Sequence, residues 1–359
     1  MNELYYVYPV YQKNSFHVIS KAHISYLSLK VKVQEIDESI LDNIMWTGDK
    51  SILLHPVGYL LLGDSVRMFY SRIKRLDRLK KVAKRLGGFD TADSDAISQV
   101  FVNVLNELDL VIVPSEWAKE CYLNSGVDIP IEVLPHGLNS SFLNNSKEIT
   151  NKTIKELLEI KKKHDARLIL FFLWHSGYRK GADIVAQAMS EIQKEHDNVF
   201  LVVKTGDIVD TYLHDLLKLK MIHIKGWLSD DELRQLYDVC DVLVCPSRGG
   251  GFELNTLEGV SRGLPTLATN GMCFLDYIEY IIPIQAYDKV VVLKDNPIHI
   301  GYGYEVDIND FVKKLHDVLD NIQSYKLKFK KYSRQVRRKY AWSVICEKLY
   351  EILDDYEFI

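Results

Sequence analysis

Short apolar runs alternate with amphipathic stretches along nearly the whole chain of 359 residues. The short runs are typical of buried strands, and the stretches between them have the apolar spacing of surface helices. This alternation predicts an α/β protein with parallel, doubly wound sheets that are covered on both faces. In the first part of the chain we expect strands at 4–10, 31–36, 51–56, 110–115 and 131–137, and helices at 16–29, 66–86, 96–108 and 116–124. Further along we expect strands at 168–174, 199–204, 221–227, 241–245, 264–269 and 289–294, and helices that include 230–239 and 341–353.

A polar stretch at 139–165 separates these two series of elements. It begins with asparagines and serines and continues as a helix rich in Lys and Glu. At roughly 150 residues per domain, the chain is long enough for about two domains. We expect an N-terminal Rossmann-like domain at 1–140, a linker at 141–165, a second Rossmann-like domain at 166–338 and a terminal helix at 339–359 that returns to the first domain. Ligands of such sheets bind beyond the carboxyl ends of the strands, so two domains predict a cleft between them.

Composition narrows the class of protein. Apolar residues make up 47% of the chain, charged residues 26%, and the formal net charge is −4. These values exclude a disordered chain and a polycation built to bind nucleic acid. Five scattered cysteines without a Cys-x-x-Cys pair favour reduced thiols over a disulfide framework or a zinc site. We see no signal-peptide pattern and no apolar run of about 20 residues, so we expect a cytoplasmic protein without a bound metal.

A glycine-rich turn follows the expected strand at 241–245. Three glycines at 249–251 lie between this strand and a helix expected to begin near Leu254. Such a turn exposes backbone N–H groups at a helix N-terminus, where the helix dipole favours an anion and glycine lets phosphate or sugar approach the main chain. Glu258 falls about one turn into the helix, where its carboxylate can accept hydrogen bonds from sugar hydroxyls. Taken alone, the three glycines favour the alternative, which is a flexible surface turn with a solvated glutamate.

Residues beyond the glycines keep the spacing of a known family pattern. The matching residues are Pro246, Ser247, Phe252, Leu254, Glu258, Gly263 and Pro265. Segments at 134–139, 179–181, 226–237 and 341–343 match further parts of the same pattern in the same order. Together they resemble the retaining nucleotide-sugar glycosyltransferases of glycosyltransferase family 4. The resemblance covers 110–359 in sequence and 1–109 only in the layout of elements.

This resemblance implies a GT-B fold, in which two Rossmann-like domains face a cleft. It implies a hexosyltransferase that moves a sugar from a nucleotide diphosphate sugar, UDP- or GDP-linked, to an acceptor hydroxyl with retention of configuration. No metal and no cofactor other than the donor substrate is implied. The acceptor stays open between a glycan, a lipid and a protein.

The site residues of the family carry over position by position. Lys180 and Arg179 correspond to the cations that hold the donor diphosphate, and Glu258 to the glutamate that holds the donor ribose. His55, at the end of an expected strand, is our candidate for the family's histidine beside the donor sugar, with a structural histidine as the alternative. The other expected donor-binding residues are Gly250, Gly251, Phe252, Leu254, Asn255, Thr256, His175, Gly226, Trp227 and Leu228.

Two departures from the family pattern bear on the chemistry. The family's first glutamate is Gly250 here, and its glycine after Phe252 is Glu253. Glu253 takes over the contact to the sugar, or the turn binds a different sugar, or the chain is a catalytically impaired protein that only binds sugar nucleotides. The family's arginine before Lys-Gly is also absent, so His175 or Arg179 is expected in its place.

A basic stretch at 67–85 has the apolar spacing of a helix and contains nine Lys or Arg residues against one acid. Its cations include Arg72, Arg75, Arg78, Lys81 and Arg85. Such a helix binds an anionic membrane surface, which would make the protein peripheral on the cytosolic face. The alternatives are a nucleic acid acceptor, glycosylated through this helix, and an ordinary surface helix with solvated charges.

Overall fold

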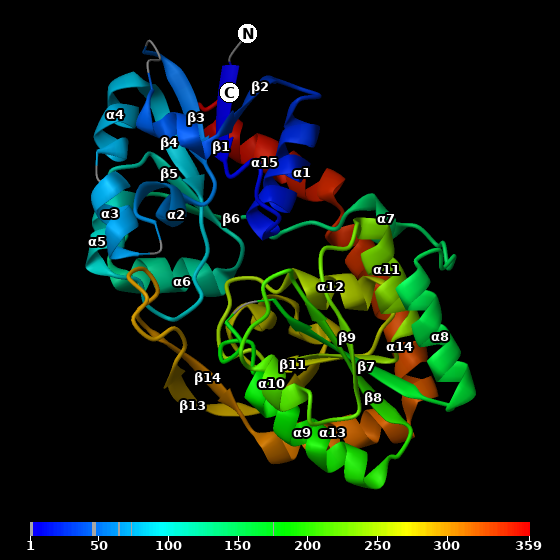
Figure 1. Ribbon diagram of the computed structural model, residues 1–359. Helices are drawn as coiled ribbons and strands as arrows, with labels where there is room; N and C mark the ends of the chain where they lie inside the picture. The colour runs from blue at the N-terminus through cyan, green and yellow to red at the C-terminus, as the bar shows by residue number, and fades with distance from the viewer. Residues whose placement is uncertain (1–2, 45–47, 64, 73, 175) are drawn as a thin grey trace. The chain divides into compact units, whose positions relative to one another are not determined.

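The computed structural model describes residues 3–44, 48–63, 65–72, 74–174 and 176–359 (Figure 1). The chain forms two compact units, each with its own large sheet. Unit 1 consists of Met1–Gly137, Leu293–Tyr302 and Trp342–Ile359, and unit 2 of Leu138–Val292 and Gly303–Ala341. Both units are doubly wound α/β folds, so the expected fold class is confirmed.

Unit 1 contains a six-stranded parallel sheet with the order β2-β1-β3-β4-β5-β6. The strands are β1 (Glu3–Tyr8), β2 (Lys32–Asp37), β3 (Lys50–Leu54), β4 (Ala83–Phe89), β5 (Leu110–Val113) and β6 (Ile131–Val133). The chain places β2 on one side of β1 and all later strands on the other side. The winding therefore reverses between β1 and β3, and such a switch point is where ligands of open α/β sheets bind.

Helices cover both faces of this sheet (Figure 1). Tyr6 of β1 points toward α1 (Ser15–Leu27), which packs on α15 (Trp342–Asp355). Val7, its neighbour in the strand, belongs instead to the core beneath α2 (Val57–Leu61), α5 (Gln99–Leu105) and α6 (Glu116–Ser125). Because successive side chains of a strand point to opposite faces, these two sets of helices lie on opposite sides of the sheet.

The helix expected at 66–86 is wrong beyond residue 82. The segment forms two short helices, α3 (Val66–Arg72) and α4 (Arg75–Val82), and then continues as β4. Residues 86–89 are buried between β3 and β5, and a Cβ atom on Gly88 would meet the carbonyl oxygen of Leu54. The two glycines at 87 and 88 thus let β4 pack closely within the sheet. The prediction of a helix here relied on the helical spacing of the preceding residues and therefore missed this strand.

For two of the five cations of the expected cationic face the expectation is wrong, because Arg72 and Arg75 are buried. Arg75 is 5% exposed and forms hydrogen bonds of 2.7 and 2.6 Å to the carboxylate of Asp42 and one of 2.7 Å to the carbonyl of Leu60. Arg72 donates to the carbonyl of Tyr59. These arginines tie η1 (Glu38–Asp42) and α2 to the basic segment instead of facing an external anion. The other three cations lie on two different elements, Arg78 and Lys81 on α4 and Arg85 on β4.

Unit 2 contains a second six-stranded parallel sheet with the order β12-β11-β10-β7-β8-β9. The strands are β7 (Arg167–Leu173), β8 (Val199–Thr205), β9 (Met221–Ile224), β10 (Val242–Cys245), β11 (Thr266–Thr269) and β12 (Ile282–Ile284). The first strand, β7, lies in the middle. The chain adds β8 and β9 on one side of it and β10 to β12 on the other, so the switch point lies between β7 and β10.

The strand expected at 289–294 is wrong as a member of this sheet. Its first residues belong to β13 (Ala286–Val291), which forms a separate two-stranded sheet with β14 (Tyr302–Val306). The sixth strand of the large sheet is β12, which contains Pro283. Proline lacks an N–H for the ladder and is tolerated at an edge, which is where β12 lies.

The helices of unit 2 form two groups. The first group contains α9 (Ala182–Glu195), α10 (Leu213–Leu216) and α13 (Ile308–Asp320). In this group α9 contacts α10, α13 and β8, and α13 also contacts β12. The second group contains α7 (Ser140–Leu143), α8 (Lys152–Lys163), α11 (Asp230–Val239), α12 (Leu254–Ser261) and α14 (Ile322–Lys339). The capped helix expected at 230–239 is confirmed, because Ser229 and Glu232 form a reciprocal capping box.

Candidate active site

Two loops meet at the switch point of unit 2. One follows β7 and leads into α9, and the other follows β10 and leads into α12. Lys180 from the first loop places its Nζ atom 2.6 Å from both carboxylate oxygens of Glu253 from the second. The Glu253 side chain is 4% exposed and that of Lys180 is 19% exposed. The structure therefore brings together two residues that lie 73 positions apart in the sequence.

Glycines allow these loops to approach closely. Gly181 has a positive φ of 74°, and a Cβ atom on it would collide with the carbonyl oxygen of Pro246. A Cβ atom on Gly250 would lie 2.7 Å from Oε1 of Glu253. The Glu253 carboxylate thus occupies the space into which a side chain at position 250 would project. A glycine at 250 and a glutamate at 253 are consequently a matched pair in this chain.

The N-termini of two helices also lie at the switch point. Both α9 and α12 begin there, and within the described chain no side chain caps either helix. Their N-terminal N–H groups and helix dipoles favour an anion at this place. Arg179 is buried beside Lys180, and its Nη1 donates to the carbonyl of Gly249 at 3.0 Å. A diphosphate is the kind of anion that such a site accommodates.

Arg248, which the sequence reading did not identify, fixes the geometry of the β10 loop. Its guanidinium pairs with the carboxylates of Asp183 and Glu305, each through two hydrogen bonds of 2.7–2.8 Å. It also stacks on the ring of Tyr178 at 4.0 Å, and its backbone N–H donates to the carbonyl of Arg179. Because Arg248 is fully occupied by these contacts, we assign it to loop positioning. No sequence spacing indicated these partners.

Glu258 lies in α12 and is buried. Its Oε2 accepts a hydrogen bond of 2.7 Å from the hydroxyl of Tyr237 in α11. Burial raises the pKa of the Glu258 carboxyl to about 7, against the opposing effect of the Tyr237 hydrogen bond. The carboxyl is therefore close to half ionised at neutral pH, so its ability to accept hydrogen bonds from a ligand depends on pH.

The remaining expected donor-binding residues that the structure describes fall at two loop ends of unit 2. Gly251, Phe252, Leu254, Asn255 and Thr256 lie at the junction of the β10 loop with α12, and Gly226, Trp227 and Leu228 follow β9. His175 lies outside the described residues. Lys204 at the end of β8 and Trp174 after β7 were not expected, although a lysine that interrupts the apolar run of β8 was a visible signal. All these loops lie at carboxyl ends of parallel strands.

His55 lies at the carboxyl end of β3, next to the switch point of unit 1. It is 3% exposed, and its Nδ1 is 3.0 Å from both the hydroxyl of Tyr6 and the Oγ of Ser20. Burial, with smaller effects from His23 and His136, holds the pKa of His55 well below its usual range. The imidazole is therefore neutral and part of a buried polar cluster.

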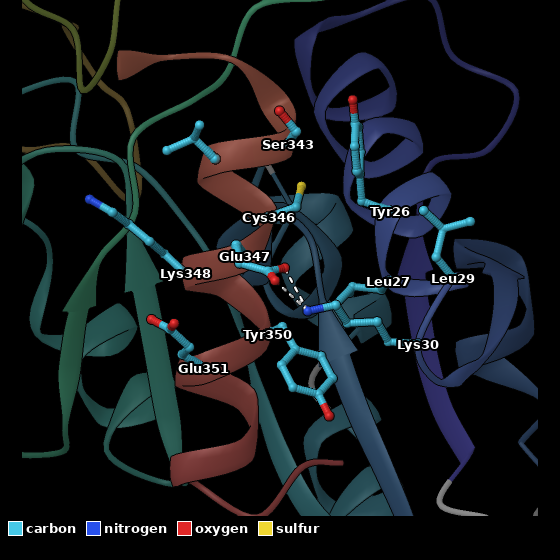
Figure 2. Close-up of a pocket in the computed structure, with 11 residues that line it drawn as sticks. Tyr26, Leu27, Leu29, Lys30, Ser343, Cys346, Glu347, Lys348, Tyr350 and Glu351 are labelled. Atoms are coloured by element: carbon cyan, nitrogen blue, oxygen red, sulfur yellow. Dashed lines mark hydrogen bonds and ion pairs between the residues drawn. The ribbon is translucent and has the colours of Figure 1, made fainter. Parts of the chain in front are cut away.

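A separate cavity of about 600 Å³ lies in unit 1 between α1 and α15 (Figure 2). Lys30 and Glu347 form an ion pair of 2.6 Å in its wall, and the Lys30 ammonium lies 4.4 Å from the ring centroid of Tyr350. None of the expected site residues lines it. Among the residues that the structure describes, no group of three or more His, Cys, Asp or Glu side chains could hold a metal ion, and no helix is long and apolar enough to cross a membrane.

Known proteins share the sequence of the region that contains this site. A family model described as Glycosyl transferases group 1 matches residues 166–283, which include the loops after β7 and β10. Uncharacterized protein 356 of Sulfolobus islandicus rod-shaped virus 1 is 30% identical over 98% of this chain and 98% of its own. Putative glycosyltransferase 45 of Sulfolobus islandicus filamentous virus is 29% identical over 74% of this chain and 73% of its own.

Solved structures share the fold at low sequence identity. Sucrose-phosphate synthase from Thermosynechococcus elongatus has a TM-score of 0.68 at 12% identity and covers 99% of both chains. WaaG, a glycosyltransferase involved in lipopolysaccharide biosynthesis, has a TM-score of 0.63 at 16% identity over 98% of this chain and 99% of its own. The chain thus belongs to the family of protein 356 of the rod-shaped virus, and it is a glycosyltransferase with a GT-B fold.

Proposed function

We propose that unit 2 binds a nucleotide diphosphate sugar with its diphosphate at the switch point between β7 and β10. The observation that carries this assignment is the Lys180–Glu253 pair, which lies where two helices begin. In this assignment the protein is a retaining, metal-independent transferase of family 4 type. Unit 1 would supply the acceptor site, and the acceptor hydroxyl would receive the sugar.

Lys180 and Arg179 would stabilise the leaving group. The nucleoside diphosphate gains negative charge as the bond between the sugar and the phosphate breaks, and fixed cations in a partly buried site stabilise that charge strongly. Lys180 is bound to Glu253 without a ligand, so donor binding would exchange this ion pair for a contact with phosphate. Glu253 would then be free to accept hydrogen bonds from sugar hydroxyls.

The place of Glu253 beside Gly250 favours a relocated carboxylate over an impaired site. A glutamate at 250 and one at 253 would compete for the same space, so the chain carries one carboxylate there, as the family pattern does. Glu258 would hold the donor ribose when it is ionised. The neighbouring glycines and the start of α12 would line the diphosphate and sugar.

Retention would follow from attack on the face that the leaving group departs from. The bond from the anomeric carbon to the phosphate oxygen breaks first, giving an oxocarbenium-like state. The acceptor oxygen then bonds to the same face of that carbon, and its proton passes to the leaving phosphate. The protein's part is to position the groups and stabilise the developing charge.

A panel of nucleotide sugars tests this function. Each is scored for thermal stabilisation of the protein and for slow release of UDP, GDP or ADP without acceptor. We expect one donor to stabilise the protein and to be hydrolysed slowly. If no nucleotide sugar does either, the donor assignment of unit 2 is wrong.

A further inference from the structure

The helix α14 of unit 2 carries eight Lys or Arg residues and no Asp or Glu in its 18 positions. The chain as a whole has a formal net charge of −4, so this positive charge is segregated onto one element. The inner face of α14 contains the buried residues Phe329, Ser333 and Val336, and the helix packs on α12 (Figure 1). Its outer face carries five exposed cations, Lys328, Lys330, Lys331, Arg334 and Arg338, which we call the outer cations.

The outer cations form no ion pair within the part of the chain that the structure describes. Two carboxylates near the helix are engaged by other cations. The buried Asp241 binds Lys326 of α14 and Lys161 of α8 through the same oxygen, at 2.5 and 2.8 Å. Glu279 lies 3.9 Å from Lys339, at the end of α14. The charge of the outer cations is therefore available to an external anion.

The spacing of the outer cations costs helix stability. Lys330, Arg334 and Arg338 follow one another at intervals of four residues, so they lie in one row on the helix surface. Like charges at this spacing destabilise a helix. Of the three, only Arg338 lies in the last turn, where the helix dipole favours a cation. An anionic surface laid along this row would replace repulsion with attraction.

The end of α8 extends this charged surface. Lys161 and Lys326 bind the same oxygen of Asp241, so the C-terminal end of α8 lies beside the first turns of α14. The next two residues of α8, Lys162 and Lys163, are exposed. At 1.5 Å per residue α14 is about 27 Å long, so its cations cover an extended surface. Such a surface fits an extended anion better than a single small one.

An exposed leucine lies among the outer cations. Leu327 is 66% exposed. It precedes Lys330 and Lys331 by three and four residues, so it lies on the same face of the helix. An apolar side chain contributes nothing to a contact with phosphates, but beside cations it can enter the headgroup region of a bilayer.

The tyrosines on this part of α14 are turned to the protein. The hydroxyl of Tyr325 donates to the carboxylate of Asp317. The ring of Tyr332 packs edge to face on Phe329 and Tyr280, with centroids 5.4 and 5.8 Å away. Proteins that bind single-stranded nucleic acid combine cations with aromatic rings on which bases stack. The exposed leucine and the engaged tyrosines therefore favour a membrane over a nucleic acid.

We propose that the outer face of α14, with Leu327 and the exposed end of α8, is a docking surface for an anionic lipid membrane. The outer cations attract the headgroups, and Leu327 enters between them. Docking through α14 holds unit 2 at the membrane surface. This surface differs from the one expected at 67–85, where Arg72 and Arg75 are buried.

Sedimentation of the full chain with lipid vesicles tests this surface. Vesicles of phosphatidylcholine with about 30% phosphatidylglycerol are the anionic probe, and pure phosphatidylcholine is the neutral one. We expect the wild type to bind only the anionic vesicles, and less as salt screens the charges. The triple variant Lys330→Gln, Arg334→Gln, Arg338→Gln should bind them about 100-fold more weakly, because each cation near such a surface contributes roughly fivefold.

A second triple variant is the charge-matched control. Lys194→Gln, Lys218→Gln, Lys220→Gln removes three exposed lysines of unit 2 that lie outside α14 and α8. It should bind anionic vesicles as the wild type does. An equal loss in both triple variants would overturn the proposal, because binding would then follow net charge alone.

Leu327→Gln separates a bilayer from other polyanions. It should weaken binding to anionic vesicles about fivefold and leave binding to soluble heparin unchanged. An equal effect on vesicles and heparin would contradict the insertion of Leu327. A labelled DNA duplex, followed by fluorescence anisotropy, tests the other partner. If the wild type binds the duplex and not the anionic vesicles, or binds neither, the proposal is wrong. None of these residues belongs to the proposed donor site, so the outcome is independent of the proposed function.

Discussion

Each unit has one switch point in a parallel six-stranded sheet, although the strand orders differ, and the side chains at the two switch points differ in charge. In unit 2 the loops at the switch point carry an ion pair, a buried arginine and two helix starts. In unit 1 the corresponding strand end carries His55 in a neutral, buried cluster with Tyr6, Ser20 and His23. The backbone fixes where a ligand can bind, and the side chains decide which ligand it is. In the function proposed above, the charged site of unit 2 would bind the diphosphate, and unit 1 would supply the acceptor site.

The largest expected effect comes from removing the lysine of the ion pair in the unit 2 site. Lys180→Met should lower kcat about 100-fold or more, because the leaving diphosphate loses a stabilising charge in the transition state. The assay is release of the nucleoside diphosphate from the donor identified in the panel. Lys194→Met, an exposed lysine at the other end of α9, is the matched control and should keep wild-type rates. Similar rates in both variants would remove Lys180 from the mechanism.

Exchanging Gly250 and Glu253 tests whether the carboxylate of this site has moved from position 250 to position 253. Gly250→Glu alone should lower activity about tenfold or more and also destabilise unit 2, because the new side chain meets the Glu253 carboxylate. Glu253→Gly alone should lose a similar factor, because it removes the carboxylate that would accept hydrogen bonds from the sugar hydroxyls. The double variant should be more active than either single variant, since the two positions share one carboxylate space. Additive losses in this cycle would contradict the relocation of the carboxylate.

Two cations of the basic segment test whether Arg75 stabilises unit 1 or binds an anionic membrane. Arg75→Gln should lower the free energy of unfolding by about 2 kcal/mol, because Asp42 and the Leu60 carbonyl lose a buried partner. Lys81→Gln, on the exposed side of α4, should leave stability unchanged. Urea denaturation measures both. If Arg75→Gln is as stable as wild type but loses binding to anionic vesicles, Arg75 binds the membrane and has no structural role.

The smallest expected effect is a pH dependence of donor affinity through Glu258. Its pKa is raised to about 7, so the carboxyl is mostly protonated at pH 6 and mostly ionised at pH 8. Donor affinity should rise several-fold over this interval, because only the ionised form accepts two ribose hydroxyls. Tyr237→Phe removes a hydrogen bond that favours the ionised form and should move the rise to higher pH. A flat profile in the wild type, like that expected of Glu258→Gln, would exclude this role.

Periodicity predicted most strands and helices, and its failures have identifiable causes. In β4 the basic residues before Leu86 continue a helical spacing into a strand whose glycines give no periodic signal. In β12 the strand is three residues long and contains Pro283. The site was harder to predict. The resemblance drew attention to Lys180, Glu253 and Glu258, but pairings across many positions, such as Arg248 with Asp183 and Glu305 or Tyr237 with Glu258, become visible only once the sheet orders the loops.

A crystal structure with the nucleoside diphosphate that binds most tightly is the most direct test of the donor site. We predict that the diphosphate lies between the loops after β7 and β10, with Lys180 Nζ within hydrogen-bond distance of a phosphate oxygen and moved away from Glu253. If the nucleotide binds elsewhere while the 2.6 Å contact between Lys180 and Glu253 persists, the central claim is contradicted.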